Sequence, residues 1–331
     1  MEKAVRDYLG QFTIGDRLVY KNLAMYPLLS SYTGSLDYLT LDEALSEHLI
    51  EVSEVSAGGT VTEIKLTNSS PRRVLILDGE ELVGAKQNRI VNTTILKDAD
   101  TTIIIPVICV EQGRWDYRSQ RFYSEERIMS YDLRAKKAAQ VYASLRRSGK
   151  FQSDQGAIWD EILDKAMRMH APSPSMAMSM MYEKEDSSIK EYLSQFHPVD
   201  MQTGAVFMIN GRIAGLEGFA RPDTFSKVFG KLVRSYALDA IDWFDPEKEP
   251  VTQDDAVSGF LADAQAATVE PHSAVALGID CRLRSNKVIG FALVFDGQVL
   301  HLSIFAPANG AKQTGETSRM GRFSARRRNR S

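Results

Sequence analysis

Three pairs of strand-like segments joined by short turns constrain most strongly how this chain folds. Residues 88–96 and 101–110 are rich in β-branched side chains and flank a turn over residues 97–100. The other two pairs turn on Asn210-Gly211 and on Asp296-Gly297. The first of these dipeptides tolerates the positive φ of a type I′ turn. Hairpins pair their strands antiparallel, so we expect antiparallel sheets.

Helical patterns accompany these strands and indicate the α+β class. Thr40 and Glu43 form a capping-box pattern, which predicts a short helix over residues 42–49. Further helices are expected over residues 132–149, 153–170, 223–243 and 252–267. We therefore expect a β-rich, antiparallel and sandwich-like subdomain over residues 1–118. A mixed α/β subdomain with antiparallel hairpins and several helices should follow over residues 119–308.

The composition is that of a soluble globular chain. Of 331 residues, 44% are hydrophobic and 25% are charged, and the net charge of −3 provides no field that attracts nucleic acid or membranes. The two cysteines are far apart, and no apolar run approaches the ~20 residues that span a bilayer. We therefore expect a cytoplasmic protein with no membrane partner and with a basic, disordered tail over residues 309–331.

One polar segment interrupts the β-rich half of the chain. A buried strand over residues 74–77 is followed by seven charged or amide side chains within twelve positions: Asp78, Glu80, Glu81, Lys86, Gln87, Asn88 and Arg89. Gly79 and Gly84 leave the backbone there open to close approach. Many convergent polar groups at a strand end are typical of ligand sites.

The first predicted hairpin indicates what lies opposite this polar segment. Antiparallel pairing about its turn puts Lys86 opposite Glu111. The same register puts Arg89 opposite Ile108 or Cys109. The polar ends of the two strands therefore meet and form one predicted pocket mouth.

Each side chain of this pocket mouth suits one part of an anionic ligand. Glu80 and Glu111 are the predicted catalytic residues, as general acid or base. The predicted ligand-binding residues supply cations for phosphate or carboxylate, an indole for stacking, and polar groups for orientation: Lys86, Arg89, Arg114, Trp115, Asp78 and Gln87. For any one of these residues, an ion pair that only stabilises a sheet edge is a better explanation than a ligand site. Their number in one place favours a site.

Other chemistries have weaker support. The spacing Cys109-x4-Arg114 approaches that of thiolate loops that hold oxyanions, but no helix start follows to lower the thiol pKa. A buried, inert cysteine is therefore favoured. The five histidines are scattered without metal-ligand spacing, so we expect no metal site and leave the cofactor open. Asp78, Glu80 and Glu111 with waters still offer oxygen ligands to a divalent cation.

Two segments outside the pocket mouth have an unusual composition. Residues 114–131 interleave arginines with aromatic side chains, which suits a nucleotide or single-stranded nucleic acid, although a connecting segment whose aromatics pack on the sheet is favoured. The wider range 112–150 holds ten Lys/Arg against four Asp/Glu, which marks either an anionic partner or solvated helix faces. Residues 171–188 are rich in Pro, Ser and Met, and we expect a mobile loop there.

The two polar strand ends also carry a family resemblance. Residues 77–96 and 105–115 resemble the ARPP family, a bacterial family named for its operon association with ADP-ribosylglycohydrolases (ARG) and rhodanese–phosphatase proteins. The likeness continues over residues 12–308. The residues here that match the motif are Asp78, Gly79, Glu80, Gly84, Gln87, Asn88, Arg89, Cys109, Glu111, Gly113, Arg114 and Trp115.

The resemblance implies a role near ADP-ribose, nucleotide or protein-modification chemistry, and it assigns no catalytic role to any of these residues. The first hypothesis is a site, enzymatic or sensing, for an anionic nucleotide-like small molecule related to ADP-ribose. The alternative is a non-catalytic binding or scaffold module in a multi-protein system. Nucleic-acid binding is the weakest of the three, and the oligomeric state stays open.

Overall fold

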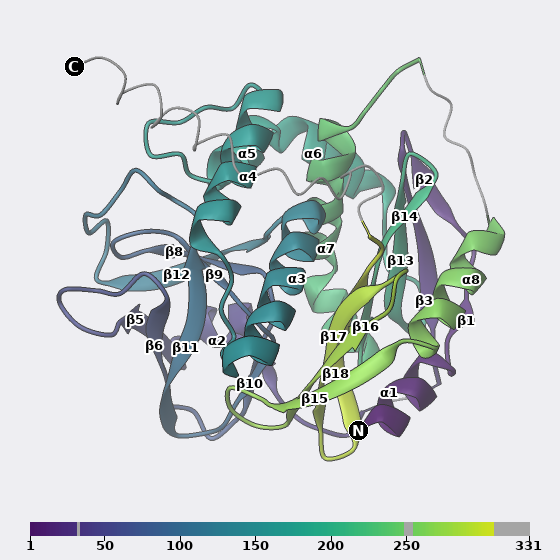
Figure 1. The fold of residues 1–331 in the computed structure, drawn as a ribbon, viewed down its shortest axis with the longest axis horizontal. Coiled ribbons are helices and arrows are strands. Elements are labelled where there is room, and N and C mark those ends of the chain that lie inside the picture. The colour runs from purple at the N-terminus through teal and green to yellow at the C-terminus, as the bar shows by residue number, and fades with distance from the viewer. Residues whose placement is uncertain (32–33, 248–253, 308–331) are drawn as a thin grey trace.

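The computed structural model describes residues 1–31, 34–247 and 254–307 of the chain. Figure 1 shows a barrel on one side, a large sheet on the other, and helices between them. The predicted α+β class is confirmed. The basic tail expected over residues 309–331 lies outside the described residues.

Capping residues in the sequence account for the start of α2 and the end of α3. The described helices are α1 (Glu2–Leu9), α2 (Leu41–Ser46), α3 (Tyr131–Ser148), α4 (Gln155–Arg168), α5 (Ser179–Lys184), α6 (Asp186–Gln195), α7 (Pro222–Asp242) and α8 (Asp254–Gln265). At the start of α2, the Glu43 carboxylate accepts from the Thr40 N–H at 2.8 Å while the Thr40 hydroxyl accepts from the Glu43 N–H. The predicted capping box is therefore confirmed. Gly149 ends α3 with a φ of 67°.

The large sheet joins the first strands of the chain to the last. Within the described residues its nine strands are β1 (Thr13–Ile14), β2 (Leu18–Tyr20), β3 (Leu23–Leu29), β13 (Gln202–Ile209), β14 (Arg212–Phe219), β15 (Thr268–Ser273), β16 (Ile279–Arg284), β17 (Ile289–Phe295) and β18 (Gln298–Phe305). Their order is β1-β3-β13-β14-β18-β17-β16-β15, with β2 paired to β3. The turns at Asn210-Gly211 and Asp296-Gly297 have positive φ at both residues, which confirms these two hairpins.

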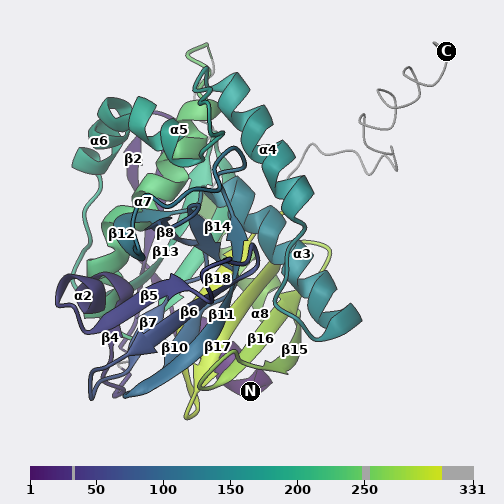
Figure 2. The same cartoon turned by 90° about the vertical axis from the view of Figure 1, so that its left-hand side faces the viewer.

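The remaining strands form a barrel and a small sheet beside it. The closed barrel runs β11 (Thr101–Cys109), β6 (Glu63–Asn68), β5 (Ile50–Glu54), β12 (Arg121–Ile128), β8 (Glu80–Gly84) and β9 (Arg89–Val91). The small sheet is β10 (Ile95–Lys97), β7 (Val74–Ile76) and β4 (Leu39–Thr40), and it shares one apolar core with the barrel. The expected sandwich-like strands close into a barrel because β12 pairs with both β5 and β8. Figure 2 shows this side of the molecule.

The first predicted hairpin forms only at its open end. Residues 89–91 pair with residues 107–109, as expected. Residues 95–97 instead pair with β7, and residues 101–106 pair with β6. The longer pairing was wrong because a turn sets where the chain reverses, whereas packing of the buried face sets which strand lies next to which.

Two further segments differ from the sequence-based expectation. Residues 121–128, expected as a connection, form β12. The expected mobile loop over residues 171–188 contains α5 and the start of α6 instead. Met178 and Met181 are fully buried there, and burial of these flexible apolar side chains accounts for an ordered segment.

Helices cover both faces of the large sheet. On one face, Phe207 of β13 stacks on Tyr236 of α7 with ring centroids 4.0 Å apart, and both side chains are fully buried. On the other face, α1 and α8 share a core with residues such as Val206 and Leu216. Strands from the two sides of the predicted boundary between residues 118 and 119 pair with each other: β3 pairs with β13, and β12 pairs with β5 and β8. The division into two subdomains therefore stays a prediction. No helix in the described ranges is both long and apolar enough to cross a membrane.

Two glycines test this packing in opposite directions. A methyl group added at Gly204 in β13 would clash with the carbonyl oxygen of Glu217 in the neighbouring strand, so we expect Gly204→Ala to destabilise the protein by about 1–3 kcal/mol. At Gly230, inside α7, nothing lies within 4 Å of such a methyl group. Gly230→Ala should therefore stabilise by about 0.5–1 kcal/mol through helix propensity. Urea denaturation measures both, and equal effects would contradict the β13–β14 and α7 packing.

Candidate functional site

The predicted pocket-mouth residues separate into three places in the fold. Six of them gather at one end of the barrel: Lys86, Gln87, Arg89, Glu111, Arg114 and Trp115. We call this place the barrel mouth, formed by residues 54–60, 84–89 and 109–118. Asp78 instead lies against α3, and Glu80 lies against α7. The expectation that these two carboxylates enter the same pocket was wrong, because the turn between β7 and β8 directs them toward helices.

Strand pairing explains why the six residues meet. Arg89 pairs with Cys109, which is one of the two partners predicted for it. Beyond that pair, the Gln87 side-chain amide donates to the carbonyl oxygen of Glu111 at 2.9 Å. The predicted register is therefore confirmed at this end of the hairpin.

Arg89 is the fully buried cation of the barrel mouth. It donates to Gln87 Oε1 at 2.8 Å and to the carbonyl oxygen of Thr60 at 3.0 Å. Its Nη2 also lies 3.8 Å from the buried carboxylate of Glu54. These contacts tie the loop between β5 and β6 to the start of β9, so Arg89 organises the barrel mouth from within.

Glu111 is the buried carboxylate of the barrel mouth. Its Oε2 accepts from Arg114 at 2.6 Å and from the Asn88 N–H at 3.2 Å, and Arg118 lies 3.5 Å from its Oε1. Burial alone would raise the pKa of Glu111, but these donors outweigh it and hold the pKa below its ordinary value. A carboxylate held ionised in this way positions its arginines better than it serves as a base near neutral pH.

Two aromatic side chains are exposed at the barrel mouth. Trp115 and Tyr117 are each 42% exposed, and the Lys86 ammonium lies 5.3 Å and 5.1 Å from their ring centroids. The Arg89 guanidinium lies 5.7 Å from the Trp115 ring. Large aromatic side chains usually pack inward, and the sequence favoured such packing on the sheet for residues 114–131. Here they present open ring surface next to cations.

The barrel mouth has an excess of one positive charge. Its cations are Lys86, Arg89, Arg114 and Arg118, and its carboxylates are Glu54, Glu111 and Asp116. Because the two glutamates are buried against arginines, the remaining cations determine how the rim attracts ions.

Cys109 lies behind the barrel mouth as a buried thiol. Burial raises its pKa, which does not favour a reactive thiolate. The side-chain amide of Gln155, in the first turn of α4, accepts from the Cys109 N–H at 2.9 Å and donates to its carbonyl oxygen at 2.8 Å. Helix α4 is thereby attached to the end of β11.

The methionine-rich segment lines one side of the barrel mouth. The Met178 N–H donates to the carbonyl oxygen of Val110, and the Gly113 N–H donates to that of Ser175, both at 2.9 Å. A side chain at Gly113 would clash with the backbone of this segment. A single antiparallel bridge between Glu111 and Ala177 thus joins the segment to the chain just after β11, and these contacts fix the backbone that leads to Trp115.

Asp78 belongs to a second polar cluster, between the barrel, α3 and the large sheet. It forms a buried ion pair with Lys137 of α3, whose ammonium also donates to the carbonyl oxygens of Val91 and Asn92 at 3.2 Å and 3.3 Å. The Asp78 N–H donates to the hydroxyl of Thr94 at 3.0 Å. We call this place the joint cluster, and its members are Asp78, Thr94, Arg134, Lys137, Glu217 and His301.

The joint cluster continues onto the large sheet. The Thr94 hydroxyl lies 2.7 Å from His301 Nδ1, and the Glu217 carboxylate lies 3.5 Å from His301 Nε2. Arg134 of α3 lies 2.7 Å from the other oxygen of Glu217. Burial alone would raise the pKa of Glu217, but Arg134 and His301 outweigh it and lower the pKa to about 2. The side chains of Thr94, His301 and Glu217 therefore lie next to one another in that order, and all three are buried.

Five members of the joint cluster were not predicted from the sequence: Thr94, Arg134, Lys137, Glu217 and His301. One signal was available in the helix over residues 132–149, where Arg134 and Lys137 precede Ala138 and Val141 on its apolar face. Charged side chains on the buried stripe of a helix require buried partners. The strands that carry Glu217 and His301 offered no comparable signal, because polar positions alternate in many half-buried strands.

Glu80 lies in the third place, with one cation and a second carboxylate. The Lys231 ammonium pairs with Glu80 and lies 2.5 Å from Asp42, while Glu80 Oε2 accepts from the Leu77 N–H at 2.8 Å. Burial and, to a lesser extent, repulsion from Asp42 raise the pKa of Glu80 to about 7, although Lys231 opposes both. Glu80 and Glu111 share no partner and so cannot act as one pair.

The carboxylates and histidines of the described residues do not gather as metal ligands. No group of three or more His, Cys, Asp or Glu side chains in that part of the chain could hold a metal ion. Asp78, Glu80 and Glu111, the three oxygen donors considered from the sequence, lie in the three separate places.

Comparison with known proteins identifies the family. The sequence model of the ARG and Rhodanese-Phosphatase-superfamily-associated Protein domain matches residues 11–305. The chain belongs to this family. Neither the curated proteins nor the solved structures gave a match.

The family assignment confirms the resemblance drawn from residues 77–96 and 105–115. Both the barrel mouth and the joint cluster lie inside the matched part of this ARG and Rhodanese-Phosphatase-superfamily-associated Protein domain. The family description names an association with ARG and with the rhodanese-phosphatase superfamily, and it names no ligand.

Removing one partner of the joint cluster should be costly. Lys137→Met leaves the carboxylate of Asp78 buried without its cation, so we expect the free energy of unfolding to fall by about 3–5 kcal/mol. Adding Asp78→Asn removes the stranded charge and should restore part of the loss. Urea denaturation of the single and double variants measures both effects.

Lys190→Met is the matched control, because Lys190 pairs with Asp186 at 2.5 Å on the exposed surface of α6. Its loss should cost about 1 kcal/mol or less. Equal losses for Lys190→Met and Lys137→Met would show that the joint cluster has no special role.

The raised pKa of Glu80 predicts a pH dependence of stability. The folded state keeps a proton on Glu80 up to about pH 7, whereas the unfolded state loses it near the ordinary value of 4.5. Stability should therefore fall as pH rises between these two values, by up to about 3 kcal/mol. Glu80→Gln, which mimics the protonated form, should lack this fall. Unfolding free energies at both ends of the window test the prediction, and parallel profiles for the two proteins would contradict it.

Proposed function

We propose that the barrel mouth binds an anionic, nucleotide-like small molecule, with ADP-ribose as the first candidate. The observation that carries this proposal is the exposed pair Trp115 and Tyr117 with the Lys86 ammonium beside both rings. Open ring surface next to a cation matches a base joined to phosphate. The family description supports the choice of ADP-ribose, because it associates the domain with ARG, an ADP-ribosylglycohydrolase.

The predicted site residues then divide into two roles. Trp115 and Tyr117 would stack on the base, and Lys86 and the 56% exposed Arg118 would bind phosphate. Gln87, Arg89, Glu111 and Arg114 are buried or nearly so and hold one another and the backbone. These four residues would position the rim without touching the ligand.

The proposal is for binding and does not extend to a chemical step. Glu111 is held ionised by Arg114, and Glu80 is engaged by Lys231 away from the barrel mouth. A general acid or base has to reach the reacting group and to titrate near the working pH. Glu111 lies at the barrel mouth but is buried and held ionised, and Glu80 has a pKa of about 7 but lies elsewhere, so neither residue meets both conditions.

One observation favours the alternative of a scaffold module. Most hydrogen bonds of the buried side chains in the barrel mouth go to one another or to the backbone, as in a network that only closes the barrel end. Substitution of Arg89 or Glu111 cannot separate the two hypotheses, because both side chains are fully buried and their loss lowers stability in either case. The exposed rim has to be tested instead.

The rim is tested by Trp115→Ala. A ligand that binds only the folded state raises its melting temperature, so ADP-ribose, NAD, other nucleotides and divalent metals should be screened by thermal shift. For the ligand that stabilises the wild-type protein, we expect Trp115→Ala to weaken binding by about 1–3 kcal/mol through lost stacking. Isothermal titration calorimetry measures this loss.

Phe244→Ala is the matched control, since Phe244 is 45% exposed but lies after the end of α7. It should leave the affinity unchanged. No thermal shift with any nucleotide, or equal loss in both variants, would favour the scaffold module over a ligand site.

A further inference from the structure

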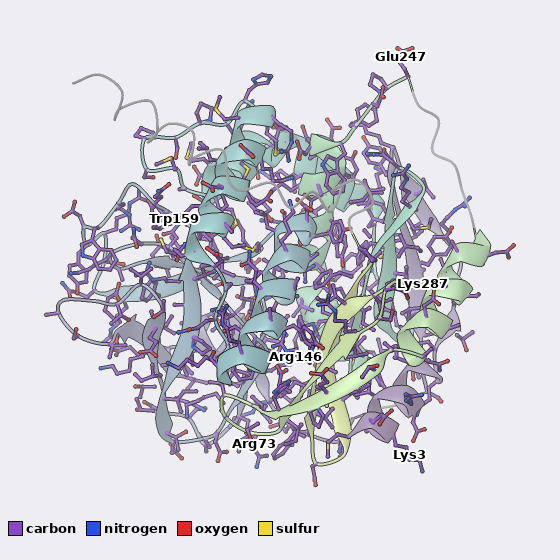
Figure 3. All side chains as sticks on the ribbon, viewed as in Figure 1. Lys3, Arg73, Arg146, Trp159, Glu247 and Lys287 are labelled. Carbon is purple, nitrogen blue, oxygen red and sulfur yellow. The ribbon has the colours of Figure 1, made fainter. Side chains whose placement is uncertain are left out.

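A second basic feature lies at the far end of α3, outside the barrel mouth. The last turns of α3 place Arg146 and Arg147 at the surface, and the end of β16 places Arg284 opposite them. An open cavity of about 500 Å³ lies between the two elements, and its lining consists of Tyr142, Ala143, Arg146, Arg147 and Arg284. We call it the arginine pocket. Figure 3 labels Arg146 on α3, apart from Trp159 of α4 beside the barrel.

Two arginines of the arginine pocket have no carboxylate partner among the described residues. Within the described part of the chain, no carboxylate lies within 4.0 Å of the guanidinium groups of Arg147 and Arg284. Arg146 has only Glu270, at 3.9 Å, and the other oxygen of Glu270 accepts from the Tyr142 hydroxyl at 2.7 Å. Three cations therefore face one carboxylate that is already hydrogen-bonded.

The Tyr142 ring sets the geometry of these cations. The guanidinium carbon of Arg284 lies 5.1 Å from the ring centroid, and that of Arg146 lies 5.9 Å from it. The tyrosine is only 5% exposed, so it offers no open face to a base. The arginine pocket therefore differs from the barrel mouth: it presents positive charges and hydrogen-bond donors without a stacking surface.

Favourable interaction with the helix dipole explains only part of this arrangement. Arg146 and Arg147 lie in the last turn of α3, where cations are stabilised. Arg284 belongs to a strand and gains nothing from that dipole. Its place on the same tyrosine ring brings cations from two elements, far apart in the sequence, to one cavity.

We propose that the arginine pocket binds the phosphate or diphosphate group of a small phosphorylated molecule. Guanidinium groups match phosphate oxygens in pairs, and neighbouring arginines are the usual donors for such groups. The cavity is largely open to solvent, so it fits a small anion held by charge and not an enclosed ligand. The site is independent of the barrel mouth, and its occupant is recognised by charge and not by a base.

Pyrophosphate is the probe that tests this proposal on the full chain. Isothermal titration calorimetry at low ionic strength should detect its binding to the wild-type protein. The double variant Arg146→Gln/Arg284→Gln should bind about 10- to 100-fold more weakly, because it loses two charged donors. Both side chains are exposed, so the double variant should have the same melting temperature as the wild-type protein.

The matched control is Arg212→Gln, which removes an exposed arginine without an ion pair among the described residues at the start of β14. It should bind pyrophosphate as the wild-type protein does. Trp115→Ala should also bind it normally, which separates this site from the barrel mouth.

Three results would overturn the proposal. The first is no pyrophosphate binding, or equal binding by the double variant. The second is loss of pyrophosphate binding in Trp115→Ala, which would place the anion at the barrel mouth. The third is a short single-stranded DNA that binds through Arg146 and Arg284 where pyrophosphate does not, with an affinity that falls steeply with salt. That result would assign the arginine pocket to a nucleic-acid backbone.

Discussion

Ion pairs buried between the barrel, α3 and the large sheet are the interaction on which the rest of this structure depends. Asp78 of the barrel side meets Lys137 of α3, and Arg134 of the same helix meets Glu217 of the sheet. Removing these charges from water costs several kcal/mol per ion, and only a complete set of partners offsets that cost. Because each element supplies part of the set, all three have to be in place together. The joint cluster therefore specifies one arrangement of barrel and sheet.

The elements that meet at the joint cluster also carry the barrel mouth and the arginine pocket. β8 follows Asp78 and leads to the turn that carries Lys86, so the joint cluster and the barrel mouth lie at opposite ends of one short hairpin. α3 likewise contributes Lys137 to the joint cluster and Arg146 to the arginine pocket. A rigid centre thus holds two charged surfaces apart. One combines cations with exposed rings, and the other presents cations alone.

Much of the local structure was predictable because it depends on neighbouring residues. The turn at Asn210-Gly211, the capping box of Thr40 and Glu43, and the stop at Gly149 all follow from backbone preferences of a few positions. The pairing of residues 95–97 with β7 did not follow, and neither did closure of the barrel by β12. Those choices depend on which apolar faces can be buried together, and segments far apart in the chain decide that.

The sequence by itself determined the α+β class, the register that brings Gln87 and Arg89 to Glu111, and the concentration of polar groups at that strand end. Only the tertiary structure decided which of those groups face solvent. It buried Arg89 and Glu111, exposed Trp115, and turned Asp78 toward a lysine that no local pattern pairs with it. The physical reason is that side chains alternate between the two faces of a strand whatever surrounds it, whereas the elements that pack against the strand decide which face is buried.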